Sequence, residues 1–381
     1  DPADVTVSVS TPATPVNPGD PVPVLDPATG VVSVPADTPA GTYTITYEVC
    51  EDLNPANCDT ATVTVEVTAA PIVATADTPP VVNGLTGDPS VVNAFDNDTL
   101  NGAPVDPADI TATVSTPATP VNPGDPVPAL DPATGIVSVP ANTPAGTYTI
   151  AYEVCEDLNP TNCDTALVNV TVDAAPIVAN DDSVGGVNGF TGEDDAASVF
   201  AENGSGTDTL NGTPVVAGDV SVTTITPASS LGGAVPVLQA DGTVDVPAGT
   251  TAGTYTIVYE LCENLNPSNC DQATITVSVD AAPIVAVDDA VVGVNGFTGE
   301  TAVINVLTPN GGGPDTLNGA AVVPSQVSVT QTVAATPINP GDPVPVVNAD
   351  GSVDVPAGTP AGSYTMQATL SNGKRADCLV H

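Results

Sequence analysis

Cysteines are the residues of this 381-residue chain whose spacing points most directly to chemistry. Six of the seven form three pairs with one common spacing, and these are Cys50 with Cys58, Cys155 with Cys163, and Cys262 with Cys270. A structural zinc site needs four ligands of the Cys or His type, and the chain has a single His, at position 381. We therefore predict a disulfide within each pair, each closing a loop of about nine residues and contributing roughly 2.5 kcal/mol.

The elements that must position these cysteines are two strands of a hairpin that recurs at residues 42–67, 147–172 and 254–279. On each arm, apolar side chains alternate with threonine, which is the period-two pattern of a half-buried strand. Cys50 and Cys58 fall on the polar face, where the intervening loop leaves and rejoins the hairpin. The pattern predicts a β-hairpin in which the two cysteines lie opposite each other.

Aspartates near the expected domain joints are the second group with chemical potential. The residues concerned are Asp173, Asp181, Asp182, Asp280, Asp288 and Asp289. Carboxylates that converge at a joint could bind Ca²⁺ and stiffen the array, although no EF-hand spacing occurs. The alternative is that these aspartates are exposed and only increase solubility.

Catalytic motifs are not found in the sequence. No His precedes His381 and no Lys precedes Lys374, and neither a Gly-x-Ser-x-Gly elbow nor a phosphate-binding glycine motif is present. Adjacent carboxylates such as Glu51 and Asp52 recur at the hairpin tip, where a solvated loop is the simpler explanation. We expect a protein that is not an enzyme.

The charge of the chain is strongly one-sided, with 45 acidic residues against two basic ones and a formal net charge of -43. Nucleic acid and anionic membrane surfaces are therefore poor partners. No apolar run reaches the ~18 residues of a membrane span, so we expect no membrane insertion. Three regular cysteine pairs predict an oxidising compartment, and hence an extracellular or cell-surface location.

Composition and periodicity together predict an all-β protein made of tandem Ig-like β-sandwich domains in an extended array. Threonine, valine, proline and glycine dominate, tryptophan is absent, and short strands are separated by turn signals at intervals typical of sandwiches. The first cysteine of each pair recurs at a spacing of about 105 residues, which is long enough for a unit to bury its own core. The predicted domains are 1–68, a partial repeat that lacks its opening strands, then 69–173, 174–280, and 281–381 with a divergent last strand.

Each unit has a tyrosine at the start of its penultimate strand, where an Ig-like sandwich carries its tyrosine corner. These are Tyr43, Tyr148, Tyr255 and Tyr364. An ordinary core tyrosine is the alternative interpretation.

The motif NDTLNG, followed by PAGTYTITYEVCEDLNPANCDTATVTV, resembles the Ig-like repeats of large bacterial cell-surface adhesins. The resemblance covers nearly the whole chain. It implies an Ig-like fold and an extended extracellular stalk, and it identifies no ligand.

The two ends depart from the repeat pattern. The first unit lacks its opening third, and after Leu370 the family pattern stops, with Ser371 at the first cysteine position and a predicted tight turn at Asn372-Gly373 before Lys374. These ends are either irregular copies of an array or an open edge that accepts a strand from another molecule.

From these features we predict an extracellular structural or adhesive protein, a stalk or a filament subunit, with itself (head-to-tail) or other surface proteins and glycans as partners. The alternative is a surface binding module that recognises glycan or protein through its sandwich loops.

Overall fold

The structure is a computed structural model, and it describes residues 2–310, 312–370 and 374–380. In this part of the chain every regular element is a β-strand, except for two three-residue 3-10 helices, η1 (Pro2–Asp4) and η2 (Pro324–Gln326). The predicted all-β class is confirmed. The chain divides into two compact units, one of Asp1–Ile177, Leu210–Gly212 and Cys262–Cys270, and one of Val178–Thr209, Thr213–Leu261 and Asp271–His381.

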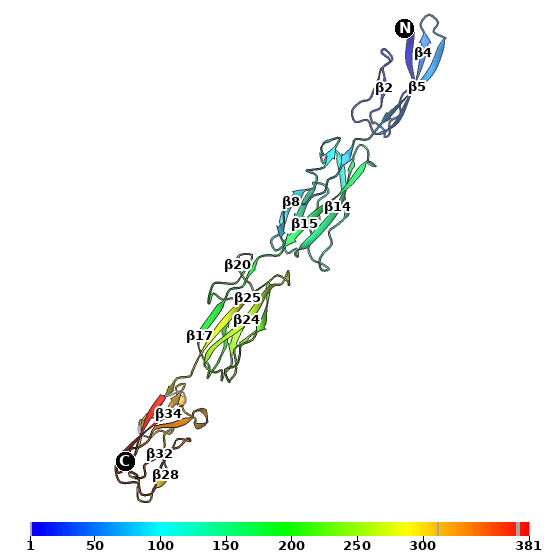
Figure 1. The fold of residues 1–381 in the computed structure, drawn as a ribbon. Coiled ribbons are helices and arrows are strands. Elements are labelled where there is room, and N and C mark those ends of the chain that lie inside the picture. Colours follow the sequence, from blue (N-terminus) through cyan, green and yellow to red (C-terminus); the bar gives the residue numbers. More distant parts are fainter. Residues whose placement is uncertain (1, 311, 371–373, 381) are drawn as a thin grey trace. The chain divides into compact units, whose positions relative to one another are not determined.

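The first repeat contains the hairpin in its simplest setting. Its strands are β1 (Val5–Thr11), β2 (Val24–Leu25), β3 (Val32–Ser33), β4 (Gly41–Glu51) and β5 (Cys58–Val67). They form the sheets β1-β4-β5 and β2-β3. Antiparallel pairing of β4 with β5 places Tyr43 opposite Val65 and Cys50 opposite Cys58, as the alternation of apolar and polar residues predicted (Figure 1).

The second repeat shows the complete pattern. Its strands are β6 (Ile72–Val73), β7 (Val82–Asn83), β8 (Asp88–Asn93), β9 (Thr99–Leu100), β10 (Ala103–Pro104), β11 (Ile110–Thr116), β12 (Ala129–Leu130), β13 (Ile136–Val139), β14 (Gly146–Glu156) and β15 (Cys163–Asp173). The four-stranded sheet has the order β11-β14-β15-β7, and the two three-stranded sheets are β12-β13-β8 and β10-β9-β6. Side chains of β14 and β15 pack with those of β8 and β13 in one core, so these two sheets form a sandwich.

The third repeat has the same three sheets. Its strands are β16 (Ile177–Val178), β17 (Asp182–Asn188), β18 (Glu193–Ser198), β19 (Thr209–Leu210), β20 (Thr213–Pro214), β21 (Val220–Thr226), β22 (Val237–Leu238), β23 (Thr243–Val246), β24 (Gly253–Glu263) and β25 (Cys270–Asp280). The sheet orders are β17-β25-β24-β21, β18-β23-β22 and β16-β19-β20.

The fourth repeat has this arrangement as well. Its strands are β26 (Ile284–Val285), β27 (Asp289–Val291), β28 (Glu300–Asn305), β29 (Thr316–Leu317), β30 (Ala320–Ala321), β31 (Val329–Val333), β32 (Val346–Val347), β33 (Ser352–Val355), β34 (Tyr364–Leu370) and β35 (Lys374–Val380). The divergent segment after Leu370 still supplies the last strand, since β35 pairs antiparallel with β34 and parallel with β27. The turn predicted at Asn372-Gly373 lies outside the described residues.

The tyrosine at the start of each penultimate strand is a tyrosine corner. Its hydroxyl donates to the backbone carbonyl four residues upstream, at distances of 2.6 to 2.9 Å. The pairs are Tyr43 with Pro39, Tyr148 with Pro144, Tyr255 with Thr251, and Tyr364 with Pro360. All four rings are buried, so the bond satisfies the one polar atom of an otherwise apolar side chain.

The first repeat lacks the strand that covers the hairpin edge in the complete repeats. In the second repeat β7 pairs in parallel with β15, and Asp77 forms a further bridge to Val168. In the first, β5 pairs with β4 alone among the described strands. Tyr47 is accordingly only half-buried, whereas its counterpart Tyr152 is fully buried.

Candidate functional site

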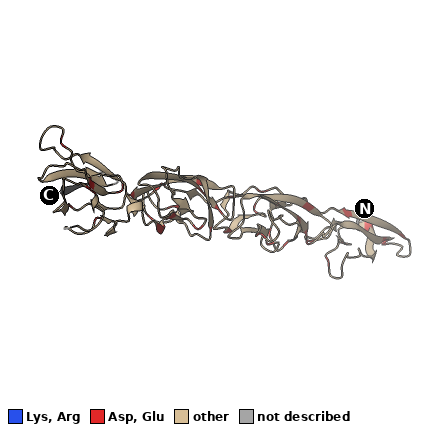
Figure 2. Ribbon diagram, turned by 90° about the horizontal axis from the view of Figure 1, so that it is seen from below, with Lys and Arg blue, Asp and Glu red and all other residues tan. Residues whose placement is uncertain are grey.

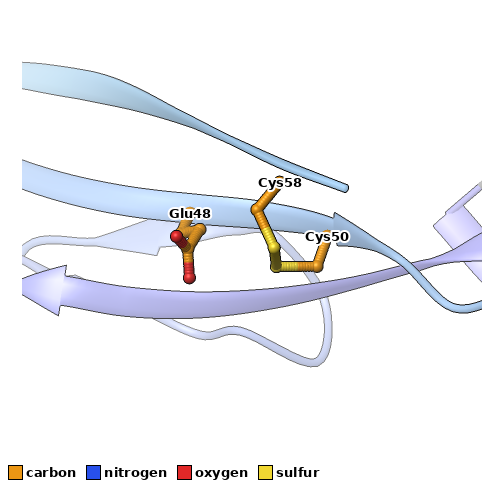
Figure 3. Close-up of side chains that lie close together, drawn as sticks. All are labelled: Glu48, Cys50 and Cys58. Carbon is orange, nitrogen blue, oxygen red and sulfur yellow. A yellow bond between two sulfur atoms is a disulfide. The ribbon is translucent and has the colours of Figure 1, made fainter. Parts of the chain in front are cut away.

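Disulfides close the tip of the hairpin in the first three repeats. Cys50 and Cys58, Cys155 and Cys163, and Cys262 and Cys270 are each bonded, with Cα atoms 4.1 Å apart. Glu48 lies beside the first of these disulfides, two positions before Cys50 on β4 (Figure 3). In the described part of the chain, the groups of three potential metal ligands are this one and its two equivalents. Their sulfur atoms are bonded to each other and do not offer thiolate ligands.

The loop that each disulfide closes is organised around one glutamate. Asn54 Nδ2 donates to Glu51 Oε1 at 2.8 Å, and Asn57 Nδ2 donates to Glu51 Oε2 at 3.0 Å. The bonds from Asn57 and Asn54 hold the pKa of Glu51 below its ordinary value. In the third repeat Asn266 and Asn269 bond Glu263 in the same way, so the sequence Asn-Pro-x-Asn-Cys defines a preorganised loop.

The disulfide loop also contacts the joint that precedes its own repeat. Asn162 Nδ2 donates to the carbonyl oxygen of Ala70 at 2.7 Å, and Asn269 Nδ2 donates to that of Ala175 at 2.7 Å. Ala70 and Ala175 are the same residue of the recurring Ala-Ala-Pro-Ile-Val segment. Each loop thus fixes the backbone of the segment that joins its repeat to the one before.

A second asparagine of the loop reaches the preceding repeat itself. The amide N of Ala40 donates to Asn159 Oδ1 at 2.6 Å, and the amide N of Ala145 donates to Asn266 Oδ1 at 2.7 Å. Both alanines belong to the Pro-Ala-Gly turn that leads into the tyrosine-corner strand. Successive joints within the first compact unit therefore repeat one contact.

A buried pair of aspartates is the other recurring polar feature, and it occurs in each complete repeat. In the third repeat the hydroxyl oxygen of Tyr259 lies 3.0 Å from Asp182 Oδ2 and 3.2 Å from Asp208 Oδ2. Asp208 Oδ1 also accepts the amide N–H of Asn180 at 2.6 Å. Both aspartates are at most 3 % exposed.

The second and fourth repeats carry the same pair. In the second, Asp77 and Asp98 are buried, and the Tyr152 hydroxyl lies 3.0 Å from Asp98 Oδ2. In the fourth, Asp289 and Asp315 are buried without such a tyrosine, because Ala368 occupies its position.

Burial dominates the ionisation of these carboxyl groups. It raises the pKa of Asp182 to about 7, the hydrogen bond from Tyr259 opposes that rise, and the charge of Asp208 adds to it. Burial and then the neighbouring Asp98 raise the pKa of Asp77 to about 6. Burial and then Asp315 raise the pKa of Asp289 to about 7. A buried carboxylate without a compensating charge is costly, so these pairs favour the protonated state at mildly acidic pH.

The six aspartates predicted to bind calcium have two kinds of environment. Asp182 and Asp289 are buried in the pairs, while the other four are exposed, and these are Asp173, Asp181, Asp280 and Asp288. In the described residues no three carboxylates converge at a joint. The partners of Asp182 and Asp289 are instead Asp208 and Asp315, which sequence reasoning missed.

The buried pairs do meet one requirement of a cation site. Asp182 Oδ1 and Asp289 Oδ2 are buried oxygens without a hydrogen-bond partner, as are Asp77 Oδ2 and Asp315 Oδ2. Unpartnered carboxylate oxygens are the ligand type that Ca²⁺ prefers. The donor set of the pairs therefore fits a calcium ion in type, whereas the four exposed aspartates do not belong to the same cluster.

Acidic side chains are scattered over the strands and loops of every repeat (Figure 2). Within the described ranges, no helix has the length and apolar character needed to cross a bilayer.

No family model matches the chain, and no curated protein is similar to it. Among solved structures, similarity is found to the human desmocollin-1 ectodomain, with 11% identity and a TM-score of 0.30 over 99% of this chain and 74% of that one. Drosophila N-cadherin EC1-4 shows 11% identity and a TM-score of 0.24 over 99% and 92%. Mouse cadherin-23 EC22-24 shows 13% identity and a TM-score of 0.27 over 73% and 86%. Because these TM-scores are low, the fold is assigned from the sheets and register of this chain alone.

The class of protein that these features define is a tandem array of Ig-like β-sandwich repeats. Three of the repeats are closed by a disulfide at the hairpin tip, and the complete ones contain a buried carboxylate pair.

Proposed function

We propose that this protein is an extracellular stalk or filament subunit whose Ig-like repeats act mechanically and not catalytically. The observation that carries the proposal is the repeated joint contact, in which Asn159 bonds Ala40 and Asn266 bonds Ala145. A contact that recurs with the same atoms gives each repeat a defined orientation on the last, which a load-bearing array requires. Disulfides at the hairpin tips and a strongly acidic surface suit such an array to the outside of the cell.

Small-angle X-ray scattering of the full chain tests this function. The wild-type protein is expected to scatter as a stiff rod, and the double variant Asn159→Ala, Asn266→Ala as a more flexible particle with a smaller radius of gyration. Asn122→Ala is the matched control, because Asn122 bonds only within its own loop, to Asp125. A wild-type profile already typical of freely jointed domains, and unchanged in the double variant, would contradict a mechanical stalk.

Calcium binding at the acidic residues that follow the joints is part of the proposed function, and what supports it is the pair of unpartnered oxygens on Asp182 and Asp289. In the third repeat Asp182 and Asp208 would supply carboxylate ligands, and in the fourth Asp289 and Asp315 would do so. A bound ion would offset the charge of each buried pair. Thermal melts in calcium and in chelator test this. We expect a higher melting temperature in calcium, and the increase should shrink in Asp182→Asn; identical melts with calcium and with chelator would exclude the site.

Head-to-tail assembly by strand addition also belongs to the proposal. It is supported by the edge of β5, which pairs only with β4 among the described strands, whereas β15 accepts β7 on its equivalent edge. A strand added there would lie parallel to β5 and cover the half-buried Tyr47. A synthetic peptide of residues 71–84 is expected to protect β5 amides from hydrogen exchange. Unchanged exchange at saturating peptide would exclude this mode of assembly.

A further inference from the structure

We propose that the end face of the fourth repeat binds the disulfide loop at Cys50–Cys58 of a second copy of this chain. The end face is defined here as Asn295, Gly296, Phe297, Thr359, Pro360 and Ala361, which line one hollow with Tyr364. The inference deepens the proposed function, because it places a contact between molecules on the surface that serves as a joint inside each molecule.

The end face repeats the atoms that form the internal joints. Ala361 lies in the Pro-Ala-Gly turn of its repeat, as Ala40 and Ala145 do in theirs. The amide N–H groups of Ala40 and Ala145 donate to an asparagine of the next repeat's disulfide loop. In the described structure the N–H of Ala361 has no such acceptor.

A side-chain amide on the end face shows the same relationship. Within the compact units, Asn83 Nδ2 donates to Asn211 Oδ1 at 2.9 Å and Asn188 Nδ2 donates to Asn318 Oδ1 at 2.8 Å. Asn295 is their counterpart, and its Oδ1 accepts the N–H of Phe297 at 3.1 Å as theirs accept the N–H two residues on. The side chain of Asn295 is therefore held in the same way, but it is exposed and its Nδ2 has no acceptor among the described residues.

The apolar part of the end face is exposed to match. Phe297 is 87 % exposed, whereas Phe190 at the same position of the third repeat is 41 % exposed. An aromatic ring left this open beside unpartnered amide donors is typical of a surface that binds a partner.

The complementary surface is the disulfide loop of the first repeat. Leu53 is 88 % exposed, compared with 38 % for Leu158 in the loop of the second repeat. Asn54 is exposed, whereas Asn266 is 8 % exposed against Ala145. The first loop therefore carries the contact groups of the other two loops in an uncovered state.

Asn54 is already in the orientation that the contact needs. Its Nδ2 donates to Glu51 Oε1, as Asn266 Nδ2 donates to Glu263 Oε2, and this leaves Asn54 Oδ1 to accept from a partner. In the complex Asn54 Oδ1 would accept the N–H of Ala361, and Leu53 would cover Phe297. Preorganisation of both surfaces lowers the ordering cost of binding.

Charge sets the conditions of this association. The chain has a formal net charge of -43, so two copies repel each other and added salt screens the repulsion. Association should therefore strengthen as sodium chloride is raised. It should also be weak in dilute solution, because one loop on one face is a small interface.

Sedimentation velocity of the full chain over a range of concentrations tests the proposal. We expect wild-type protein to form head-to-tail oligomers at high concentration and high salt. Leu53→Ser and Phe297→Ser each remove one of the two surfaces, and each variant alone should remain monomeric. An equimolar mixture of the two should form dimers but nothing larger, because only one loop and one end face remain intact between them.

Val292→Ser is the matched control, since Val292 is 72 % exposed in the fourth repeat but lies outside the end face. This variant should associate as wild type does. Wild-type protein that stays monomeric under all conditions would overturn the proposal, as would oligomers that survive both single variants. The first outcome leaves the stiffness measured by scattering intact, so failure of this contact is distinguishable from failure of the stalk function.

Discussion

Tyr259 holds Asp182 and Asp208 together, with its hydroxyl oxygen 3.0 Å from one carboxylate and 3.2 Å from the other. The carbonyl oxygen of Asn180 lies 3.1 Å from the same hydroxyl. A hydroxyl donates one hydrogen bond, so three acceptors around it exceed the donors available. A proton on one carboxyl group supplies the missing donor, which links the stability of the repeat to pH.

The second repeat offers the clearest test of this link, through Asp77. The pKa of Asp77 is raised to about 6 from 3.8, so its stabilising protonation is complete below pH ~4 and lost as the pH rises through ~6. Each unit of such a shift corresponds to about 1.4 kcal/mol. Asp77→Asn keeps the shape of the protonated group and cannot ionise, so the stability of the variant should fall less than that of wild type between pH 4 and pH 7. Hydrogen exchange of second-repeat amides in chelator measures this.

Asp109→Asn is the matched control for that experiment, because Asp109 is an exposed aspartate of the same repeat. It should follow the wild-type pH dependence. If Asp77→Asn does so too, Asp77 has an ordinary pKa and the pair is not a protonated unit.

Removal of the tyrosine hydroxyl from the buried pair should destabilise the third repeat. Tyr259→Phe leaves carboxylate oxygens of Asp182 and Asp208 without their shared donor, at a cost of about 1–3 kcal/mol. Because the hydrogen bond from Tyr259 lowers the pKa of Asp182, the variant should also titrate at higher pH than wild type. Hydrogen exchange within the third repeat, measured between pH 5 and pH 8, reports both effects.

Tyr255→Phe serves as the comparison, since it removes the tyrosine-corner bond to Thr251 and no contact with a carboxylate. Its cost should be smaller, about 0.5–1.5 kcal/mol, and independent of pH in this range. Equal and pH-independent costs for the two variants would show that Tyr259 acts only as a core aromatic.

Loss of one disulfide should weaken its repeat without unfolding it. The double variant Cys155→Ser, Cys163→Ser opens a loop of about nine residues, and the loop-entropy model gives a loss of roughly 2.5 kcal/mol. The hairpin register should survive, because β14 and β15 pair over ten residue pairs from Gly146–Val172 to Cys155–Cys163. Urea unfolding followed by exchange mass spectrometry should show a lower midpoint for the second repeat only. An unchanged midpoint would mean that the bond constrains nothing that the strands do not already fix.

Local sequence patterns predicted the hairpin and its disulfides because the information lies within one stretch. The alternation around Cys50 and Cys58 fixes which residues face the core and which cysteines oppose. The tyrosine corner at Tyr148 was likewise visible from its place after the Pro-Ala-Gly turn.

The buried pairs were not predicted, because their members are far apart in sequence. Asp182 meets Asp208 across 26 positions and a turn, and Asp208 was interpreted only as part of the Asp-Thr-Leu-Asn-Gly turn. A usable signal existed: an aspartate precedes Thr-Leu-Asn-Gly in all three complete repeats, as Asp98, Asp208 and Asp315. Sequence proximity instead grouped Asp173 with Asp181 and Asp182, although Asp173 and Asp181 are exposed and Asp182 is buried.

Single-molecule force spectroscopy of the full chain tests the mechanical function most directly. We predict a series of separate unfolding peaks, each releasing up to roughly 35 nm of chain, as expected for domains of about 100 residues. After reduction, each disulfide-bearing repeat should release about 3 nm more, because the closed loop then extends. Extension without discrete peaks, or peaks whose spacing does not change on reduction, would contradict an array of disulfide-closed, load-bearing repeats.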